Sequence, residues 1–340
     1  MRGRVYLRPI PCARSRPGAH ALTGGPLGFA EIEVLRRDAP AEILPLEAAA
    51  ALHDPDILAR LAAPRRPLGA ALPEPALMGV VNVTPDSFSD GGRHDAPDRA
   101  VAHALSLAEA GAAILDIGGE STRPGAEPVP EAQELDRVLP VIEGLVAAGC
   151  KLPISIDTRK ARVARQAIAA GASLFNDVSA LSFDPESVTV PARAYCLMHA
   201  LGDPRTMQRS PRYDDVLLDV YDYLAGRVAE AELAGIDRAQ MIVDPGIGFG
   251  KTMAHNLALI RGLSLFHGLG CAILLGVSRK RFIGTLSGVI EADQRVAGSI
   301  AAGLWGLGQG AQILRVHDVA ETAQALRVWQ ALQEEGEHEP

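Results

Sequence analysis

From residue 76 onward, short apolar runs rich in β-branched residues alternate with longer stretches whose apolar residues recur at helical spacing. We expect strands at 76–83, 112–118, 152–157, 173–178, 194–199, 240–245, 272–278 and 311–316. Helical stretches follow most of them, at 98–110, 131–148, 160–170, 214–234, 292–307 and 318–334. Continuously apolar strands separated by helices predict a parallel sheet that is covered on both faces.

Eight strand–helix units predict an α/β fold, the closed (β/α)8 TIM barrel. A doubly wound open sheet is the alternative, but no Gly-x-Gly-x-x-Gly turn follows the first strand. Residues 1–72 differ from the rest because they are rich in Arg and Pro, and their piece from Phe29 to Leu35 alternates like a strand. We therefore expect an N-terminal extension over 1–72, with short strands, and a barrel over 73–340. The first 18 residues are basic but lack the apolar stretch of a secretion signal, and a solvated, partly disordered end fits them as well as any function does.

Polar side chains are concentrated at the C-terminal ends of the expected strands. They are Asn82, Asp116, Asp157, Asn176, Asp177, His199, Asp244, Ser278, Arg279, Lys280, Arg315 and His317. One charged strand end usually belongs to a turn or a helix cap. In a barrel, however, all eight strand ends open at one mouth, where active sites are built. The whole set therefore predicts a functional site at that mouth.

The motifs in the chain exclude several kinds of chemistry. No His-Glu-x-x-His, Gly-x-Ser-x-Gly or Cys-x-x-Cys pattern occurs. The stretch GIGFGKT (246–252) resembles a phosphate-binding loop, but Pro245 stands where that motif requires its first glycine, so a Gly-rich strand-to-helix loop is the better interpretation. The mixed Asp, Asn, Lys, Arg and His set suits a flat heterocycle with N–H and C=O groups, together with a phosphate.

Charge and cysteine content limit the partners. The net charge of −8 argues against general nucleic-acid binding and means that an anionic substrate needs a local cationic pocket. Cys196 and Cys271 lie in or beside apolar runs and are expected to be buried thiols, which favours a reducing, cytoplasmic compartment. No apolar run is long enough to span a membrane.

Eight segments in order carry a family resemblance. They are MGVVNVTPDSFSDGG (78–92), ILDIGGESTRPGA (114–126), PISIDTRK (153–160), FNDVSA (175–180), LMH with PRTMQ (197–208), DPGIGFGKT (244–252), LLGVSRKRFIG (274–284) and RVHDV (315–319). With these segments the chain resembles the dihydropteroate synthases. The resemblance implies a transferase of folate biosynthesis that condenses 6-hydroxymethyl-7,8-dihydropterin pyrophosphate with p-aminobenzoate to give 7,8-dihydropteroate and pyrophosphate.

The resemblance also implies the role of each matching residue. The implied pterin-binding residues are Asp157, Asn176, Met198, Asp244 and Lys280. The implied pyrophosphate-binding residues are Asn82, Thr122, Arg315 and His317, with Asn82 also contacting Mg²⁺, the implied cofactor. The implied p-aminobenzoate-binding residues are Asp90, Thr122, Arg123, Phe249, Ser278 and Lys280. The implied catalytic residues are Asp157, Lys280, Arg315 and His317.

Further properties follow from the same resemblance. It implies a sulfonamide target and a homodimer formed through helices near the C-terminus, where the Ala- and Gly-rich stretch AGSIAAGLWGLGQG could pack against a second copy or against its own barrel. Two alternative functions share the pterin-binding Asp and Asn residues: a pterin-dependent methyltransferase and a non-catalytic pterin-binding paralogue. The first has no need for the STRPG, SRK and Arg-x-His motifs, and the second is expected to lose loop or phosphate residues that are present here.

Overall fold

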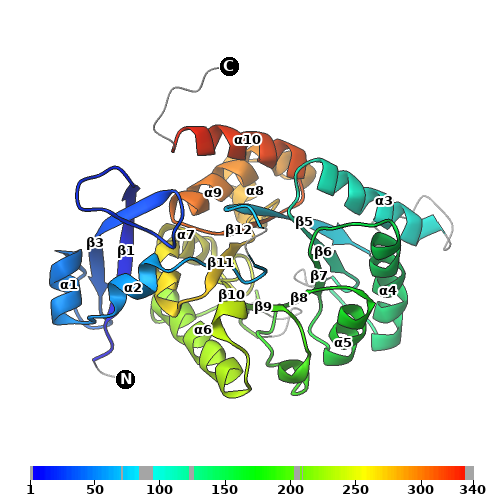
Figure 1. The fold of residues 1–340 in the computed structure, drawn as a ribbon, viewed down its shortest axis with the longest axis horizontal. Coiled ribbons are helices and arrows are strands. Elements are labelled where there is room, and N and C mark those ends of the chain that lie inside the picture. The colour runs from blue at the N-terminus through cyan, green and yellow to red at the C-terminus, as the bar shows by residue number, and fades with distance from the viewer. Residues whose placement is uncertain are drawn as a thin grey trace.

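Eight parallel strands close into a barrel in chain order, and β12 pairs with β5 to complete it (Figure 1). The computed structural model describes residues 3–69, 72–83, 95–121, 126–202, 207, 208 and 210–333. The strands are β5 (Ala76–Asn82), β6 (Ile114–Gly118), β7 (Ile154–Asp157), β8 (Leu174–Asp177), β9 (Ala194–Met198), β10 (Met241–Asp244), β11 (Ala272–Leu275) and β12 (Ile313–Val316). All eight predicted strands and the predicted barrel are confirmed, and each strand is slightly shorter than predicted.

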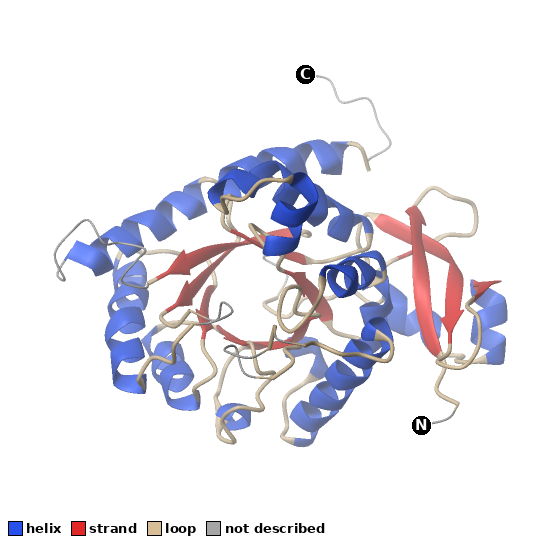
Figure 2. Ribbon diagram, turned by 180° about the vertical axis from the view of Figure 1, so that it is seen from behind, coloured by secondary structure: helices blue, strands red, loops and turns tan. Residues whose placement is uncertain are grey.

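Helices surround the barrel (Figure 2), and an α-helix separates each pair of consecutive barrel strands except β8 and β9, which only a 3-10 turn connects. They are α3 (Asp95–Glu109), α4 (Glu131–Ala147), α5 (Ala161–Ala170), α6 (Val216–Leu233), α7 (Met253–Arg261), α8 (Arg281–Ser287), α9 (Val296–Gly308) and α10 (Val319–Ala331). Short 3-10 turns are η2 (Ser187–Thr189), η3 (Arg238–Gln240), η4 (Leu263–Leu269) and η5 (Asp293–Arg295). The helices α7 and α8 were missing from the predicted set, because segments of so few turns give a weak helical period.

Strand alternation sorts the side chains of the barrel into two sets. Successive residues of a strand point to opposite faces, so every second residue faces the interior. Met78, Ile114, Leu174, Ile242 and Ile313 pack together as an apolar cluster of buried residues. Two residues further along β6, β8, β10 and β12, toward their C-terminal ends, the interior positions become polar, whereas β5 has Val80 at that position. The polar positions hold Asp116, Asn176, Asp244 and Arg315, with Asp157 ending β7.

The N-terminal extension folds into a small sheet with two helices. Its elements are β1 (Tyr6–Ala13), β2 (His20–Ala21), β3 (Leu27–Leu35), β4 (Glu42–Pro45), α1 (Leu46–Leu52) and α2 (Ile57–Ala62). The predicted strand near 29–35 is confirmed as β3, which pairs antiparallel with β1, β2 and β4. Phe29 and Ile32 belong to a separate apolar core. The expectation of a solvated chain start was wrong, because β1 lies within this sheet.

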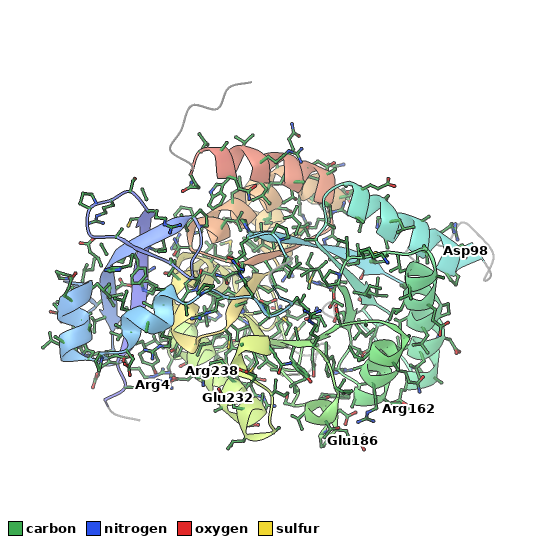
Figure 3. The ribbon with its side chains drawn as sticks, in the orientation of Figure 1. Arg4, Asp98, Arg162, Glu186, Glu232 and Arg238 are labelled. Carbon is green, nitrogen blue, oxygen red and sulfur yellow. The ribbon has the colours of Figure 1, made fainter. Side chains whose placement is uncertain are left out.

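The extension is joined to α6 by a polar and aromatic cluster. Asp222 accepts hydrogen bonds from Arg4 Nη1 at 2.6 Å, from the Tyr6 hydroxyl at 2.7 Å and from Arg37 Nη2 at 2.7 Å. The ring of Tyr6 meets Tyr221 edge to face, with centroids 5.6 Å apart. Figure 3 shows Arg4 at this junction. Tyr6 also packs with Leu218 of α6 and Leu265 of η4 in a cluster of buried residues, so the extension and the barrel wall share buried contacts.

Two general features of the chain bear on its surroundings. All four cysteines are free thiols, and Cys196 and Cys271 are buried as predicted. Among the helices in the described parts of the chain, none combines the length and apolar character needed to cross a bilayer.

We expect Asp222→Ala to lower the free energy of unfolding by about 1–3 kcal/mol, because it removes the acceptor for the buried Tyr6 hydroxyl and two guanidinium groups. The measurement is the midpoint of thermal unfolding by circular dichroism. Asp136→Ala, at an exposed position of α4, serves as the control and should leave the midpoint unchanged. Equal midpoints for both variants would mean that the cluster does not hold the extension.

Candidate active site at the barrel mouth

Arg315 on β12 joins two carboxylates inside the barrel. Its Nε donates to Asp116 Oδ2 on β6 at 2.6 Å, and its Nη2 donates to Asp157 Oδ2 on β7 at 2.7 Å. Asn176 on β8 places its Nδ2 3.3 Å from the same Asp116 oxygen. Asp116 is fully buried, and both aspartates face one guanidinium. The interaction therefore ties together strands that lie on either side of β5.

The charges in this cluster stabilise one another. Burial lowers the pKa of Arg315, but the Asp116 and Asp157 carboxylates outweigh burial and raise it, so the guanidinium stays charged. Burial raises the pKa of Asp157, and Arg315 acts in the opposite direction. The second oxygen of Asp157, Oδ1, is buried and has no hydrogen-bond partner within the described residues. A buried unpaired acceptor is costly, so this oxygen is suited to receive an N–H group from a ligand.

A second charged pair lies nearby, at the ends of β10 and β11. Asp244 Oδ1 accepts a hydrogen bond from the backbone N–H of Gly246 at 2.7 Å, and Lys280 Nζ donates to the Ile247 carbonyl. Burial lowers the pKa of Lys280 to about 8, while Asp244 raises it. A methyl group at Gly276 would lie 3.7 Å from Lys280 Nζ, 3.8 Å from Arg315 Cβ and 3.9 Å from Asp244 Oδ2. The glycine therefore leaves space where three polar residues meet.

The turn after β11 positions Ser278 and Lys280 through a strained residue between them. Arg279 has φ of 59°, in the left-handed region that costs a non-glycine residue free energy. Its guanidinium forms a bidentate pair with Asp318, with Nε 3.0 Å from Oδ2. Ser278 Oγ lies 3.0 Å from His317 Nδ1 and accepts from the His317 N–H at 3.2 Å. The turn and the end of β12 are therefore locked together.

The predicted residues fall into three groups. The structure brings together Asp157, Asn176, Asp244, Lys280 and Arg315 through the contacts above, and buried Met198 pairs in register with Asp244. Lys280 Nζ lies 4.9 Å from the ring centroid of Phe249. Asn82 and His317 lie at the ends of β5 and β12, which are neighbouring strands, and Ser278 contacts His317. Asp90, Thr122 and Arg123 lie outside the described residues.

Asp116 belongs to this cluster but received no role from the sequence. The sequence places Asp116 only among the polar strand ends. Its position between the apolar residues Leu115 and Ile117 nevertheless indicates that its carboxylate is buried and therefore needs a polar partner. The turn interpretation does hold for Asp177, whose Oδ1 accepts from the Ser179 N–H at 2.7 Å and whose Oδ2 accepts from the Leu181 N–H at 2.9 Å. Strand-end position alone therefore does not separate ligand-binding residues from turn residues.

The chemistry of the cluster is that of a binding site rather than of a nucleophile. Carboxylate and amide oxygens suit the N–H groups of a flat heterocycle, and the two partly buried cations Lys280 and Arg315 suit the neighbouring negative charge of a leaving group. Lys280 faces Phe249, so a second aromatic ring could be accommodated beside the cation.

Comparisons with known proteins agree with this geometry. The family model described as "Pterin binding enzyme" matches residues 78–317. The dihydropteroate synthase of Escherichia coli strain K12 is 46% identical over 263 residues, which span 76% of this chain and 92% of that protein. The dihydropteroate synthase of Neisseria meningitidis serogroup B is 49% identical over 270 residues, which span 77% and 94%.

Solved structures agree as well. The structure of Xanthomonas albilineans dihydropteroate synthase with 4-aminobenzoic acid has a TM-score of 0.73 and 52% identity, covering 77% of this chain and 94% of that one. The same organism's enzyme in complex with 7,8-dihydropteroate has a TM-score of 0.71 and 48% identity, covering 80% and 99%. The Yersinia pestis enzyme with a sulfonamide drug complex has a TM-score of 0.73 and 44% identity, covering 79% and 98%.

We expect Asp318→Asn to destabilise the fold more than Arg279→Gly does. Both variants lose the bidentate ion pair, but glycine adopts the positive φ without the strain of about 1–3 kcal/mol that arginine retains. Urea titration followed by tryptophan fluorescence measures both. The reverse order of stability would contradict the idea that the pair holds a strained turn in place.

Proposed function

The chain belongs to the dihydropteroate synthase family, and we propose that the polar layer at its barrel mouth binds the pterin substrate of that family's reaction. The enzyme is a transferase of folate biosynthesis that joins the pterin methylene carbon to the amino group of p-aminobenzoate and releases pyrophosphate. One observation carries the assignment of the site: the Arg315 guanidinium fixes Asp157 through one oxygen, while the other is buried and has no hydrogen-bond partner among the residues that the structure describes.

The pterin ring is proposed to be recognised at its polar edges. Asp157 Oδ1 can accept an N–H group from the aminopyrimidinone edge, while Asp244 accepts and Asn176 donates or accepts at further ring positions. Met198 would line a face of the ring, and Lys280 would donate from beside Asp244. A site built to hydrogen-bond several ring atoms rejects analogues that lack them, because its buried groups would then stay unpaired.

The leaving pyrophosphate is proposed to lie near the ends of β5 and β12. Arg315 and His317 would bind its oxygens, with Asn82 from the neighbouring strand and Thr122, which follows β6 in the sequence. Arg315 stays charged because of its two carboxylates, so it can stabilise the negative charge that develops on departure. Asp116 and Asp157 already occupy two of its N–H groups, so its remaining donors would face the phosphate.

Magnesium is proposed as the cofactor, held by Asn82 together with the pyrophosphate. No cluster of three His, Cys, Asp or Glu side chains suited to a metal occurs among the described residues. Mg²⁺ normally keeps several waters and is bound through one or two protein oxygens plus substrate phosphates, so a single amide oxygen at the strand end fits this ion. When bound, it spreads the charge of the diphosphate.

The p-aminobenzoate is proposed to bind at the outer side of the mouth. Phe249, Ser278 and Lys280 would form its pocket, since Lys280 already contacts both the Phe249 ring and the loop that carries it. Asp90, Thr122 and Arg123, which follow β5 and β6 in the sequence, are proposed to complete this end. A bound p-aminobenzoate would then present its amino group toward the pterin methylene carbon.

The reaction needs positioning more than acid–base catalysis. The C–O bond between the methylene carbon and the diphosphate breaks, and positive charge spreads into the pterin ring. The arylamine nitrogen then forms a C–N bond to that carbon and loses a proton. An aromatic amine is neutral near pH 7 and nucleophilic without a strong base, so orientation by the Phe249 pocket and stabilisation of the leaving group by Arg315 account for the rate.

Three further properties are proposed. The four free thiols favour a cytoplasmic location. A p-aminobenzoate pocket as described makes the enzyme a target for sulfonamides. Exposed Trp305 on α9, and Val328 and Leu332 on and after α10, support a homodimer, because these large apolar side chains are 55%, 59% and 78% exposed in the single chain.

The reaction is tested by incubating the protein with the pterin pyrophosphate, radiolabelled p-aminobenzoate and Mg²⁺, and following labelled dihydropteroate. We expect Mg²⁺-dependent product that falls at least about a hundredfold in Lys280→Ala, because that variant loses donors to both substrates. A Lys151→Ala control, at an exposed position, should keep full activity. Pterin binding without product would instead identify a non-catalytic pterin-binding protein.

The dimer is tested with Trp305→Glu. A charge at the centre of a buried apolar contact disfavours association, so we expect the variant to sediment as a monomer in analytical ultracentrifugation while the wild type sediments as a dimer. Leu233→Glu, at an exposed position at the end of α6, is the control and should sediment like the wild type. A monomeric wild type would contradict the proposed dimer.

A further inference from the structure

Lys251 is the sixth residue of the GIGFGKT stretch (246–252). Its side chain is turned into the protein interior. It is only 3% exposed. Its Nζ lies 2.9 Å from His199 Nδ1, 3.3 Å from the His199 carbonyl oxygen and 3.0 Å from the Phe249 carbonyl oxygen. An ammonium group has three protons, and these three acceptors can receive them all. The lysine therefore links the residue after β9 to the loop after β10.

We propose that Lys251 and His199 are positioning residues that hold the 246–252 loop so that Phe249 faces Lys280 at the p-aminobenzoate end of the site. The proposal rests on the function proposed above, because it assigns a role to the loop that carries Phe249. Lys251 would contact neither substrate. It would act through the backbone of Phe249, whose ring lies 4.9 Å from Lys280 Nζ.

The loop has an unusual backbone and depends on outside contacts. Gly246, Gly248 and Gly250 all have positive φ, at 68°, 86° and 63°. A methyl group at Gly246 would lie 1.8 Å from the His199 carbonyl oxygen, and one at Gly250 would lie 2.5 Å from Leu201 Cβ. The loop therefore lies directly against the chain that leaves β9. Glycines that permit this approach also leave the loop free to adopt other conformations unless side chains fix it.

Side chains fix the loop carbonyls one after another. Lys280 donates to the Ile247 carbonyl from the substrate side, and Lys251 donates to the Phe249 carbonyl from the buried side. The Tyr213 hydroxyl donates to the Gly250 carbonyl at 2.8 Å. Phe249 therefore lies between two anchored residues, and the direction of its ring depends on them.

His199 is neutral and can therefore accept a hydrogen bond from Lys251. Burial and the neighbouring Lys251 lower the pKa of His199 to about 2, so the ring is neutral. Because Nδ1 accepts from the ammonium group, the ring proton is assigned to Nε2. The ring also packs edge to face against Tyr223, with centroids 4.8 Å apart. The acceptor is thus fixed in both protonation and orientation.

The hydrogen bonds of buried Lys251 are not expected to increase the stability of the fold. Among the ion pairs of the described residues, none includes Lys251, so its partners are neutral acceptors. Burial lowers the pKa of Lys251 to about 7, against the opposing effect of Asp244. An apolar side chain of similar length would avoid this desolvation, which suggests that the lysine serves the geometry of the loop.

The test uses Lys251→Met in the full-length enzyme, because methionine keeps the length and removes the three donors. We expect the KM for p-aminobenzoate to rise about tenfold while the Kd for the pterin pyrophosphate changes less than about threefold, since a displaced Phe249 affects only one end of the site. Equal increases in both constants, or no change in either, would overturn the proposal.

A double-mutant cycle with Phe249→Ala separates positioning from a general structural role. If Lys251 acts through Phe249, the double variant should have the same KM for p-aminobenzoate as Phe249→Ala alone. Additive effects would overturn the proposal. An unchanged KM in Phe249→Ala would instead overturn the proposed p-aminobenzoate pocket, whereas a raised KM there with a normal Lys251→Met would overturn only the role of Lys251.

A matched pair at His199 decides the question if Lys251→Met does not fold. In His199→Asn the amide oxygen can occupy the place of Nδ1, whereas in His199→Gln it is displaced by one bond, and both lose the ring. We expect His199→Asn to keep a KM for p-aminobenzoate at least about threefold below that of His199→Gln. Equal values for the two variants would overturn the proposal.

Discussion

The guanidinium of Arg315, held between the carboxylates of Asp116 and Asp157, is the interaction on which the rest of the site depends. It places three charges in the barrel interior, where each is tolerated only because the others are present. It also determines which oxygen of Asp157 stays available for a ligand. The contacts come from β6, β7 and β12, so they form only when the barrel has closed. Folding and binding are therefore coupled through one side chain.

Much of this arrangement could be predicted from the sequence, because a (β/α)8 barrel alternates apolar strands with helices at regular intervals along the chain. Apolar strands identified the eight units, and polar residues at their ends identified the mouth. The partner of Asp116 could not be predicted, since it depends on strand register across the barrel rather than on nearby residues. Asp177 shows that a carboxylate at a strand end need not belong to the binding site, because its oxygens accept hydrogen bonds from backbone N–H groups of the turn that follows β8. In the extension, short strands were expected but only β3 was located, and α1 and α2 were not predicted, because such short elements leave a weak pattern.

Lys280 and Lys251 are the same residue type near the barrel mouth, but they have different roles because their side chains point in different directions and are buried to different degrees. Lys280 lies beside Asp244 and faces Phe249, whereas Lys251 is turned away and bonds to His199. Both donate to carbonyls of the same glycine-rich loop, from opposite sides. The sequence already favoured a Gly-rich strand-to-helix loop over a phosphate-binding loop at GIGFGKT, but only the three-dimensional path of the loop explains its lysine. The pterin site is built on strands, while the p-aminobenzoate end is built on a loop that needs such anchors.

The most direct test of the account is the affinity of Asp116→Asn for the pterin pyrophosphate, measured by isothermal titration calorimetry beside Asp136→Asn as a surface control. The substitution keeps the shape of the side chain and removes the charge that holds Arg315 Nε. We expect binding that is weaker by at least about tenfold in a folded protein, because Asp157 is no longer correctly oriented. An affinity equal to that of the wild type would contradict the claim that the Arg315 interaction organises the site.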